Sequence, residues 1–250
     1  MMKIILLGTG TTLPQKNRNA AGLLIQIFED FLLFDCGNGI LRQIENSGVD
    51  FTKIKFIFIS HLHVDHISDL PILLKAILMR GELNNIKIFG PSTIKRRIEV
   101  WFTEIYSYLN KILKKIEIEE FNQNLIETRN WKVQVFPVKH GIEAFGFKII
   151  VDNKKIVYSG DTGFCEELIE AAKNADILIH ECSYPTALGK EGHTTPLEVG
   201  QIANRSEVKK LVLTHFYPEC SGQEHEILND IKKMYNGEVF LGQDLQDFEL

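Results

Sequence analysis

Cysteine is scarce in this 250-residue chain, and its four cysteines are scattered without a C-x-x-C pair. A disulfide framework and a structural zinc knuckle are therefore not indicated. Apolar runs of about 18 residues are also missing, so we expect no membrane span. The apolar stretch at residues 4–7 is too short for the core of a signal peptide. These absences favour a cytoplasmic protein.

Positive charge is in short supply as well, because 28 lysines and arginines face 33 aspartates and glutamates. The net charge of -5 argues against a strongly basic nucleic-acid-binding surface. Hydrophobic residues make up 44% of the chain, which is enough for a full core. We expect residues 1–250 to form a single domain.

Histidine is concentrated where it is present. Three of the eight histidines lie in the hexapeptide His61-Leu62-His63-Val64-Asp65-His66, directly after the apolar run at residues 56–59. Four potential ligands on one short turn cannot all face the same ion. They can serve two ions, with His61 and His63 turned one way and Asp65 and His66 the other. The hexapeptide therefore predicts a two-metal hydrolase.

Three further residues can complete two metal shells. His140 and His215 each follow an apolar run, and Asp161 lies between glycines at the end of another. We predict that His61, His63 and His140 hold one ion, that Asp65, His66 and His215 hold the other, and that Asp161 bridges them. Imidazole and carboxylate ligands without thiolate favour Zn²⁺, with Mn²⁺ or Fe²⁺ possible.

Two ions of this kind lower the pKa of bound water to about 7, which makes hydroxide available as a nucleophile near neutral pH. The leaving group still needs a proton. His193 is the candidate general acid, with Glu181 orienting it, and Asp65 is expected to hold the nucleophile as well as to bind metal.

The hydrophobic pattern predicts strands alternating with helices. Strands are expected at residues 4–7, 23–28, 31–34, 56–59, 131–138, 145–151, 156–159, 177–179, 211–214 and 239–241. Helices are expected at residues 40–47, 69–79, 94–113, 164–174, 196–204 and 224–235. The histidine cluster would then lie on a strand-to-helix loop. Two strand-rich halves with helices outside predict two sheets packed face to face and covered on both sides.

The chain resembles the metallo-β-lactamase superfamily, and within it the ribonuclease Z group. The matching stretches are Leu7-Gly8-Thr9-Gly10-Thr11, Leu33-Phe34-Asp35-Cys36-Gly37, residues 60–66 with Asp69-Leu70-Pro71, residues 138–147, Ser159-Gly160-Asp161-Thr162, Ile179-His180-Glu181, Gly192-His193-Thr194-Thr195 and residues 211–216. The resemblance implies an α/β (α+β) fold of the four-layer αββα type and phosphodiester cleavage at the seven-ligand site. It also implies proton-transfer roles for His193 and Glu181, and a possible homodimer.

The chain departs from the ribonuclease Z pattern in four places. Asn38 replaces the usual Glu, Thr194 the usual Ser and Glu219 the usual Arg. The fourth departure is the absence of an arm. In that group an arm that grips tRNA is inserted between the residues that match His140 and Asp161, and in this chain the segment between those two residues is too short to contain it. Two substrates therefore stay open for a zinc-dependent phosphodiesterase: RNA 3′ ends, as in tRNA 3′ processing, and small or cyclic nucleotides.

Three other functions are weighed against this one. A glyoxalase II-like thioesterase or lactonase would share the metal site, but His193-Thr194-Thr195 argues against it. A binding protein without turnover would be expected to lack ligands, and none of the seven is missing. A dinucleotide-binding loop at Gly8-Thr9-Gly10 is excluded because Leu13 occupies the third glycine position and Pro14 blocks the following helix.

Overall fold

The computed structural model describes residues 2–122 and 125–250. The chain divides into two compact units, which are described separately here. Unit 1 comprises Met1–Gly8, Asn19–Asn122 and Asp244–Leu250, and unit 2 comprises Thr9–Arg18 and Gln123–Gln243. The expectation of a single domain over residues 1–250 stays a prediction.

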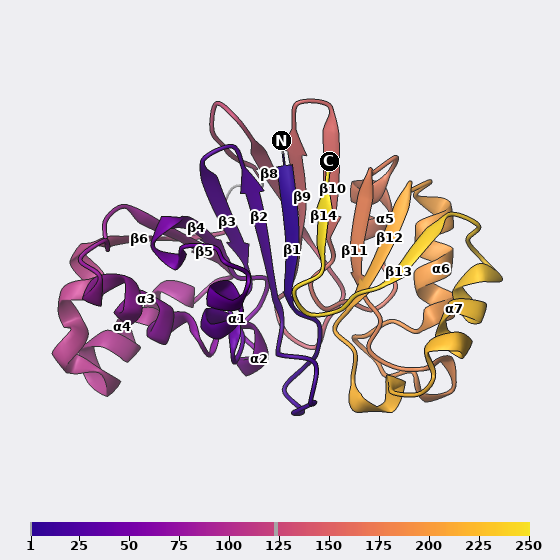
Figure 1. The fold of residues 1–250 in the computed structure, drawn as a ribbon, viewed down its shortest axis with the longest axis horizontal. Helices are drawn as coiled ribbons and strands as arrows, with labels where there is room; N and C mark the ends of the chain where they lie inside the picture. Colours follow the sequence, from indigo (N-terminus) through magenta and orange to yellow (C-terminus); the bar gives the residue numbers. More distant parts are fainter. Residues whose placement is uncertain (1, 123–124) are drawn as a thin grey trace. The chain divides into compact units, whose positions relative to one another are not determined.

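Unit 1 is built on a seven-stranded mixed sheet (Figure 1). Its strands, in spatial order, are β14 (Asp247–Glu249), β1 (Met2–Gly8), β2 (Gly22–Ile27), β3 (Asp30–Phe34), β4 (Ile54–Phe58), β5 (Ile86–Gly90) and β6 (Ile116–Glu120). The strands from β14 to β3 pair antiparallel, whereas those from β3 to β6 pair parallel.

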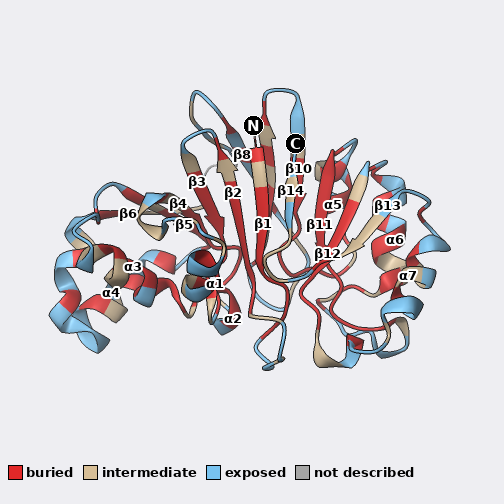
Figure 2. Cartoon of the chain, in the orientation of Figure 1, coloured by how far each residue is buried: buried red, intermediate tan, exposed pale blue. Residues whose placement is uncertain are grey.

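Helices bury one face of this sheet. They are α1 (Ile40–Asn46), the single turn α2 (Val64–Ile67), α3 (Leu70–Met79) and α4 (Ile94–Val100), with a 3-10 turn at Phe51–Lys53. Pro71 in the first turn of α3 has no N–H to leave unsatisfied there, which favours a helix start at this point. Apolar side chains of α1 and α3 form one cluster with alternate residues of the strands, and Figure 2 shows these buried stripes. The histidine cluster was expected on a loop, but its second half forms α2.

The predicted helix at residues 94–113 is wrong as a single helix. After α4 the chain forms a π-helical turn at Trp101–Ile105 and then 3-10 turns at Ser107–Lys114. The break falls at Tyr106, whose φ of -115° and ψ of 47° are not helical. Aromatic and β-branched residues fill this stretch and favour the α-helix only weakly. The widened and tightened turns still bury Phe102 and Ile112, so core packing prevails over a regular helix.

Unit 2 is built on a second mixed sheet of seven strands. In spatial order they are β13 (Glu238–Leu241), β12 (Lys210–Thr214), β11 (Ile177–Glu181), β10 (Lys154–Tyr158), β9 (Phe145–Val151), β8 (Lys132–Pro137) and β7 (Leu125–Glu127). The strands from β10 to β13 pair parallel, and those from β7 to β10 pair antiparallel. The sequence pattern does not predict β5, β6, β7 or β14.

Three helices cover one face of the second sheet: α5 (Glu166–Ala172), α6 (Pro196–Arg205) and α7 (Glu224–Lys232). Short 3-10 turns lie at Thr186–Leu188 and Pro218–Cys220. The start of α6 is fixed by a capping box, in which the Thr195 side chain and the Glu198 carboxylate satisfy each other's backbone N–H groups. Two mixed sheets with flanking helices confirm the α/β class.

The topology determines where functional side chains can gather. Parallel neighbours end at the same edge of a sheet, and ligands of such sheets bind beyond their carboxyl ends. In unit 1 the parallel pair β3 and β4 is followed by Asp35 and by residues 59–66. In unit 2 the adjacent strands β10, β11 and β12 are followed by Asp161, Ser183 and His215. Among the helices of the described residues, none is long and apolar enough to cross a membrane.

Candidate metal centre

His61 and His63 present ring nitrogens to each other in unit 1. The Nε2 atom of His61 lies 3.0 Å from Nδ1 of His63. Two imidazole nitrogens at this distance repel unless a proton or a cation lies between them. The other nitrogen of His61, Nδ1, is 3.0 Å from the Ser60 hydroxyl, so Nε2 is the nitrogen that faces His63. This geometry fits a pair of ligands for one ion.

A buried carboxylate orients His66, the last residue of the hexapeptide. Asp35, fully buried after β3, contacts Nδ1 of His66 at 2.8 Å. The same carboxylate accepts hydrogen bonds from the Ser60 backbone N–H (2.8 Å) and the Ser60 hydroxyl (2.9 Å). A carboxylate at Nδ1 fixes the proton there and leaves the Nε2 lone pair for a metal, a common arrangement around metal-binding histidines.

Asp65 is held by close backbone packing. It lies in α2 and is 7% exposed. A Cβ atom at Gly37 would lie 1.9 Å from the Asp65 carbonyl oxygen, so only glycine fits there. Beside it, the N–H of Cys36 donates to the His66 carbonyl at 2.7 Å. The loop after β3 therefore fixes the turn that carries Asp65 and His66.

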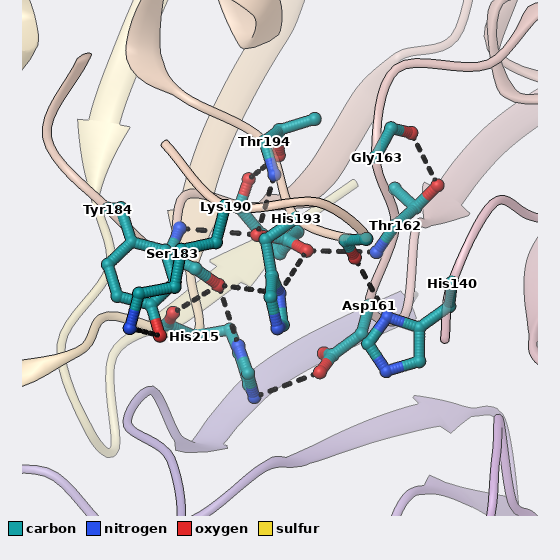
Figure 3. Close-up of polar contacts among 12 residues, drawn as sticks. His140, Asp161, Thr162, Gly163, Ser183, Tyr184, Lys190, His193, Thr194 and His215 are labelled. Carbon is teal, nitrogen blue, oxygen red and sulfur yellow. Dashed lines mark hydrogen bonds and ion pairs between the residues drawn. The ribbon is translucent and has the colours of Figure 1, made fainter. Parts of the chain in front are cut away.

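In unit 2, Asp161 and His215 lie side by side, with His215 Nε2 3.3 Å from Asp161 Oδ2 (Figure 3). The opposite ring nitrogen of His215, Nδ1, is 3.0 Å from the Ser183 hydroxyl. His193 is close by, because one potential ligand atom each from Asp161, His193 and His215 lies within 4.8 Å of the others. His215 has a φ of 59°, a conformation that non-glycine residues adopt uncommonly.

His193 is paired with a fully buried carboxylate. Its Nδ1 lies 2.9 Å from Glu181 Oε1 and 3.2 Å from the Ser183 hydroxyl. Glu181 also accepts backbone hydrogen bonds from Thr162 (2.9 Å), Ser183 (3.2 Å) and Thr194 (3.3 Å). With so many donors the carboxylate is held in one orientation, and it directs the His193 ring.

His140 is oriented by the backbone. Its Nδ1 lies 2.8 Å from the carbonyl oxygen of Gly192, the residue before His193. A proton on Nδ1 therefore donates to that oxygen and leaves Nε2 as an electron-pair donor. The rings of His140 and His193 meet edge to face with centroids 5.1 Å apart. Both histidines consequently belong to the same edge of unit 2.

His180, although next to Glu181, takes no part in this cluster. Side chains alternate along a strand, so these two neighbours in β11 face opposite sides of the sheet. His180 is fully buried, its Nδ1 is 2.6 Å from the Glu181 carbonyl oxygen, and its Nε2 has no hydrogen-bond partner in the described chain. Burial lowers its pKa from the usual value.

The donor set fits divalent metal ions. His61, His66, His140 and His215 each engage Nδ1 with a hydroxyl, carboxylate or carbonyl group, as metal-binding histidines typically do. Asp35, Ser60 and Ser183 complete this orientation and were not among the predicted site residues. Asp35 and Ser60 lie in stretches that match the ribonuclease Z pattern, whereas the signal for Ser183 is only its place after a parallel strand.

Comparison with known proteins places the chain in a family. Residues 2–235 match the family model described as "Anti-Pycsar protein Apyc1". The chain belongs to this family. Ribonuclease Z of Methanosarcina mazei is 27% identical to this Apyc1-family chain, in an alignment of 306 residues that covers 100% of the chain and 98% of the relative.

Solved structures give the same fold. The metallo-β-lactamase fold protein YhfI from Bacillus subtilis is 24% identical to this chain and has a TM-score of 0.87. The superposition covers 100% of both chains. The short form of human tRNase Z is 26% identical with a TM-score of 0.78, over 99% of this chain and 98% of that one. The metallo-β-lactamase fold and the likeness to ribonuclease Z are thus confirmed, and the Apyc1-family chain is a metal-dependent hydrolase.

Proposed function

We propose that the chain is a phosphodiesterase that cleaves RNA, in a reaction like tRNA 3′ processing, with two Zn²⁺ ions. The proposal assigns His61, His63 and His140 to one ion, Asp65, His66 and His215 to the other, and Asp161 to a bridge between them. The observation that carries it is the Glu181–His193 pair beside the Asp161–His215 pair, because it combines a proton donor with metal ligands at one edge of unit 2.

His193 acts as the general acid in this proposal. Its Nδ1–H donates to the Glu181 carboxylate at 2.9 Å, so the proton available for transfer is the one on Nε2. The buried carboxylate stabilises the positively charged ring before transfer and holds its orientation throughout. A leaving oxygen that accepts this proton departs as a neutral hydroxyl group.

The two ions, when bound, lower the pKa of a water molecule and stabilise charge on the phosphoryl oxygens. The residues of the chain supply the remaining functions. Asp65 binds metal and positions the attacking water, and Asp35 keeps the His66 ring in the ligating orientation. We further propose that the enzyme acts in the cytoplasm, as a single domain and as a homodimer.

A second candidate substrate is a small or cyclic nucleotide. One observation favours it. Between His140 and Asp161 the chain contains β9, β10, the two-residue turn at Asp152 and Asn153, and two short loops at residues 141–144 and 159–160, so this segment has no extension that could grip a large RNA. A glyoxalase II-like thioesterase or lactonase is not favoured, because the full-length relatives are ribonucleases.

The experiment is a substrate panel on purified protein of measured metal content. The panel contains bis-(p-nitrophenyl) phosphate, a tRNA precursor with a 3′ extension, a 2′,3′-cyclic nucleotide and a glutathione thioester. We expect cleavage of the artificial diester and of the tRNA precursor, both abolished by a chelator. Cleavage of the cyclic nucleotide in place of the tRNA would select the second candidate, and cleavage of the thioester alone would refute the phosphodiesterase.

A further inference from the structure

His215 has an uncommon backbone conformation for a proposed metal ligand. It follows β12 with a φ of 59°, in the left-handed region that residues with a side chain seldom adopt. Such a conformation costs free energy and persists only where the surrounding contacts hold it. The peptide group before His215 is fixed by the sheet, because the Thr214 carbonyl accepts the Cys182 N–H at 2.9 Å. The direction of the ring therefore depends on the peptide group after it.

The peptide group that joins His215 to Phe216 is held on both sides. Its carbonyl oxygen accepts a hydrogen bond from the Ser183 hydroxyl at 3.2 Å. Its N–H donates to the Thr9 carbonyl oxygen at 2.8 Å. Because these contacts fix the plane of the peptide group, they also set the ψ angle of His215.

The next peptide group, between Phe216 and Tyr217, is held in the same way. Its carbonyl oxygen accepts from the Gln15 side-chain amide at 2.7 Å, and its N–H donates to the Ser183 carbonyl oxygen at 3.2 Å. Ser183 thus contacts one side of both peptide groups, and residues 9–18 contact the other. Residues 9–18 belong to unit 2, although they follow β1 in the chain.

Arg18 ties the two ends of this segment together and covers the Phe216 ring. Its Nη1 atom donates to the Thr9 hydroxyl at 2.5 Å and to the Gly242 carbonyl oxygen at 2.7 Å. The guanidinium carbon lies 4.3 Å from the centre of the Phe216 ring, within the range of a cation–π contact. Phe216 is buried and Arg18 half-buried, so this contact is screened less than one at the surface.

We propose that Arg18 is a positioning residue for the metal ligand His215. Through Thr9 and Phe216 it holds the peptide group that follows His215, so that Nε2 of the ring keeps the direction in which it can bind an ion. The inference rests on the proposed function, because His215 is one of the ligands assigned there. It adds a role for residues 9–18, none of which belongs to the predicted site.

The test measures how tightly each of the two ions is bound. Arg18→Met nearly keeps the length of the side chain but removes its hydrogen-bond donors and its charge. We expect it to weaken the binding of one Zn²⁺ ion by about 10- to 100-fold and to leave the other unchanged, the usual cost of losing a group that orients a metal ligand. Titration with chelator-buffered Zn²⁺ gives both affinities.

Cobalt gives a second measurement that does not depend on activity. The visible absorption of bound Co²⁺ reports the ligands around the ion. We expect the wild-type spectrum to develop in two steps as Co²⁺ is added. In Arg18→Met one step should need about 10- to 100-fold more free Co²⁺ and show an altered band, because the His215 ring has lost its fixed direction.

Arg205→Met is the matched control in the same unit. The Arg205 guanidinium also lies near a phenylalanine ring, 5.8 Å from the centre of Phe164. It donates two hydrogen bonds to Glu166, at 2.8 and 2.7 Å. Both partners belong to the segment at the start of α5, so Arg205→Met should leave the two zinc affinities at their wild-type values.

Gln15→Met is a milder variant of the same segment. It removes the donor to the Phe216 carbonyl and should weaken the same ion as Arg18→Met does. The loss should be smaller, because Thr9 still holds the peptide group next to His215. Calorimetry of the metal-free proteins shows whether each variant is folded, and if Arg18→Met is not, Gln15→Met decides the test alone.

The outcomes separate this inference from the proposed function. A wild-type protein that binds fewer than two ions, or a His215→Ala variant that binds both as tightly as wild type, would refute the proposed metal centre. Unchanged affinities in Arg18→Met and Gln15→Met, with two ions bound in wild type, would refute only the positioning role. An equal loss in Arg205→Met would also overturn it, because general destabilisation of unit 2 would then explain the effect.

Discussion

The two units share one arrangement of a carboxylate, a serine and histidines beyond the ends of their strands. In unit 1 a buried carboxylate, Asp35, contacts one histidine, and the Ser60 hydroxyl lies near two histidine Nδ1 atoms. In unit 2 the buried carboxylate is Glu181, and the Ser183 hydroxyl likewise lies near two histidine Nδ1 atoms. Each carboxylate also accepts the backbone N–H of its serine.

The difference lies in what the paired histidine does. Asp35 orients His66, which we assign to a metal ion, whereas Glu181 orients His193, which we assign to proton transfer. A carboxylate at Nδ1 suits both tasks, because it strengthens Nε2 as a ligand and also stabilises a protonated ring. The pairing of a histidine with a buried carboxylate therefore does not by itself reveal the role of that histidine. The role depends on whether the Nε2 atom contacts a metal ion or the leaving oxygen of a substrate. Variants can distinguish these two cases.

The largest effect is expected at Asp161, the proposed bridge. Asp161→Ala should remove the shared ligand, so that metal content and phosphodiesterase activity fall together, with activity reaching the background rate. Metal analysis by inductively coupled plasma mass spectrometry, paired with the bis-(p-nitrophenyl) phosphate assay, measures both. Full activity in a variant that retains its metal would show that Asp161 does not bridge.

Variants of His193 and His66 test whether one histidine is a general acid and the other a metal ligand. His193→Ala should retain its metal while kcat falls by about 10² to 10⁴, the size of a general-acid contribution. His66→Ala, whose ring is paired in the same way, should lose metal along with activity. Equal metal loss in both variants would mean that His193 is a ligand rather than an acid.

Variants of the two carboxylates, Asp35 and Glu181, should differ in metal affinity and kcat in the same way as the histidine variants, with smaller effects. Asp35→Asn should weaken metal binding by about 10- to 100-fold, because the ring of His66 loses its fixed proton position. Glu181→Gln should leave metal affinity near the wild-type value and lower kcat. Titration against a fluorescent zinc chelator gives the affinities, and matching losses of affinity in the two variants would contradict the division of roles.

The smallest effect concerns a histidine outside the site. Unit 2 contains buried His180, whereas all three histidines of unit 1 lie in the cluster. Burial lowers the pKa of His180 below its unfolded value of about 6.5, so its contribution to stability is present above that pH and is lost as the pH falls through the folded pKa.

His180→Gln should therefore reduce the drop in Tm between about pH 8 and about pH 5, measured by calorimetry, because glutamine need not take up a proton. The exposed His225 on α7 provides the matched control, and His225→Gln should leave that drop unchanged. An identical drop in wild type and His180→Gln would show that His180 does not gain its proton on unfolding.

The sequence predicts what is local or periodic and misses what depends on packing. The hexapeptide from His61 to His66 is visible because its ligands are neighbours in the chain. Asp161 and His215 are predictable because each follows a strong strand pattern. Asp35 and Ser183 are not, since their partners lie 31 and 32 residues away and only strand pairing brings them together.

Packing also accounts for the segments in which the secondary structure differs from the prediction. The stretch from residue 94 to 113 has helical periodicity, but the burial of Phe102 and Ile112 is achieved through a π-turn and 3-10 turns. The short strands β7 and β14 lack a pattern of their own and form by pairing with β8 and β1. These two strands form because a neighbouring strand offers backbone hydrogen bonds, and their own residues give no strand pattern.

The main proposal is that His61, His63, His140, Asp65, His66, His215 and Asp161 bind a pair of ions. Anomalous diffraction at the zinc edge, from crystals of the full chain grown with Zn²⁺, tests it most directly. We predict two peaks, one contacted by His61, His63 and His140 and the other by Asp65, His66 and His215, with Asp161 touching both. A single peak, or peaks bound by residues of one unit only, would contradict it.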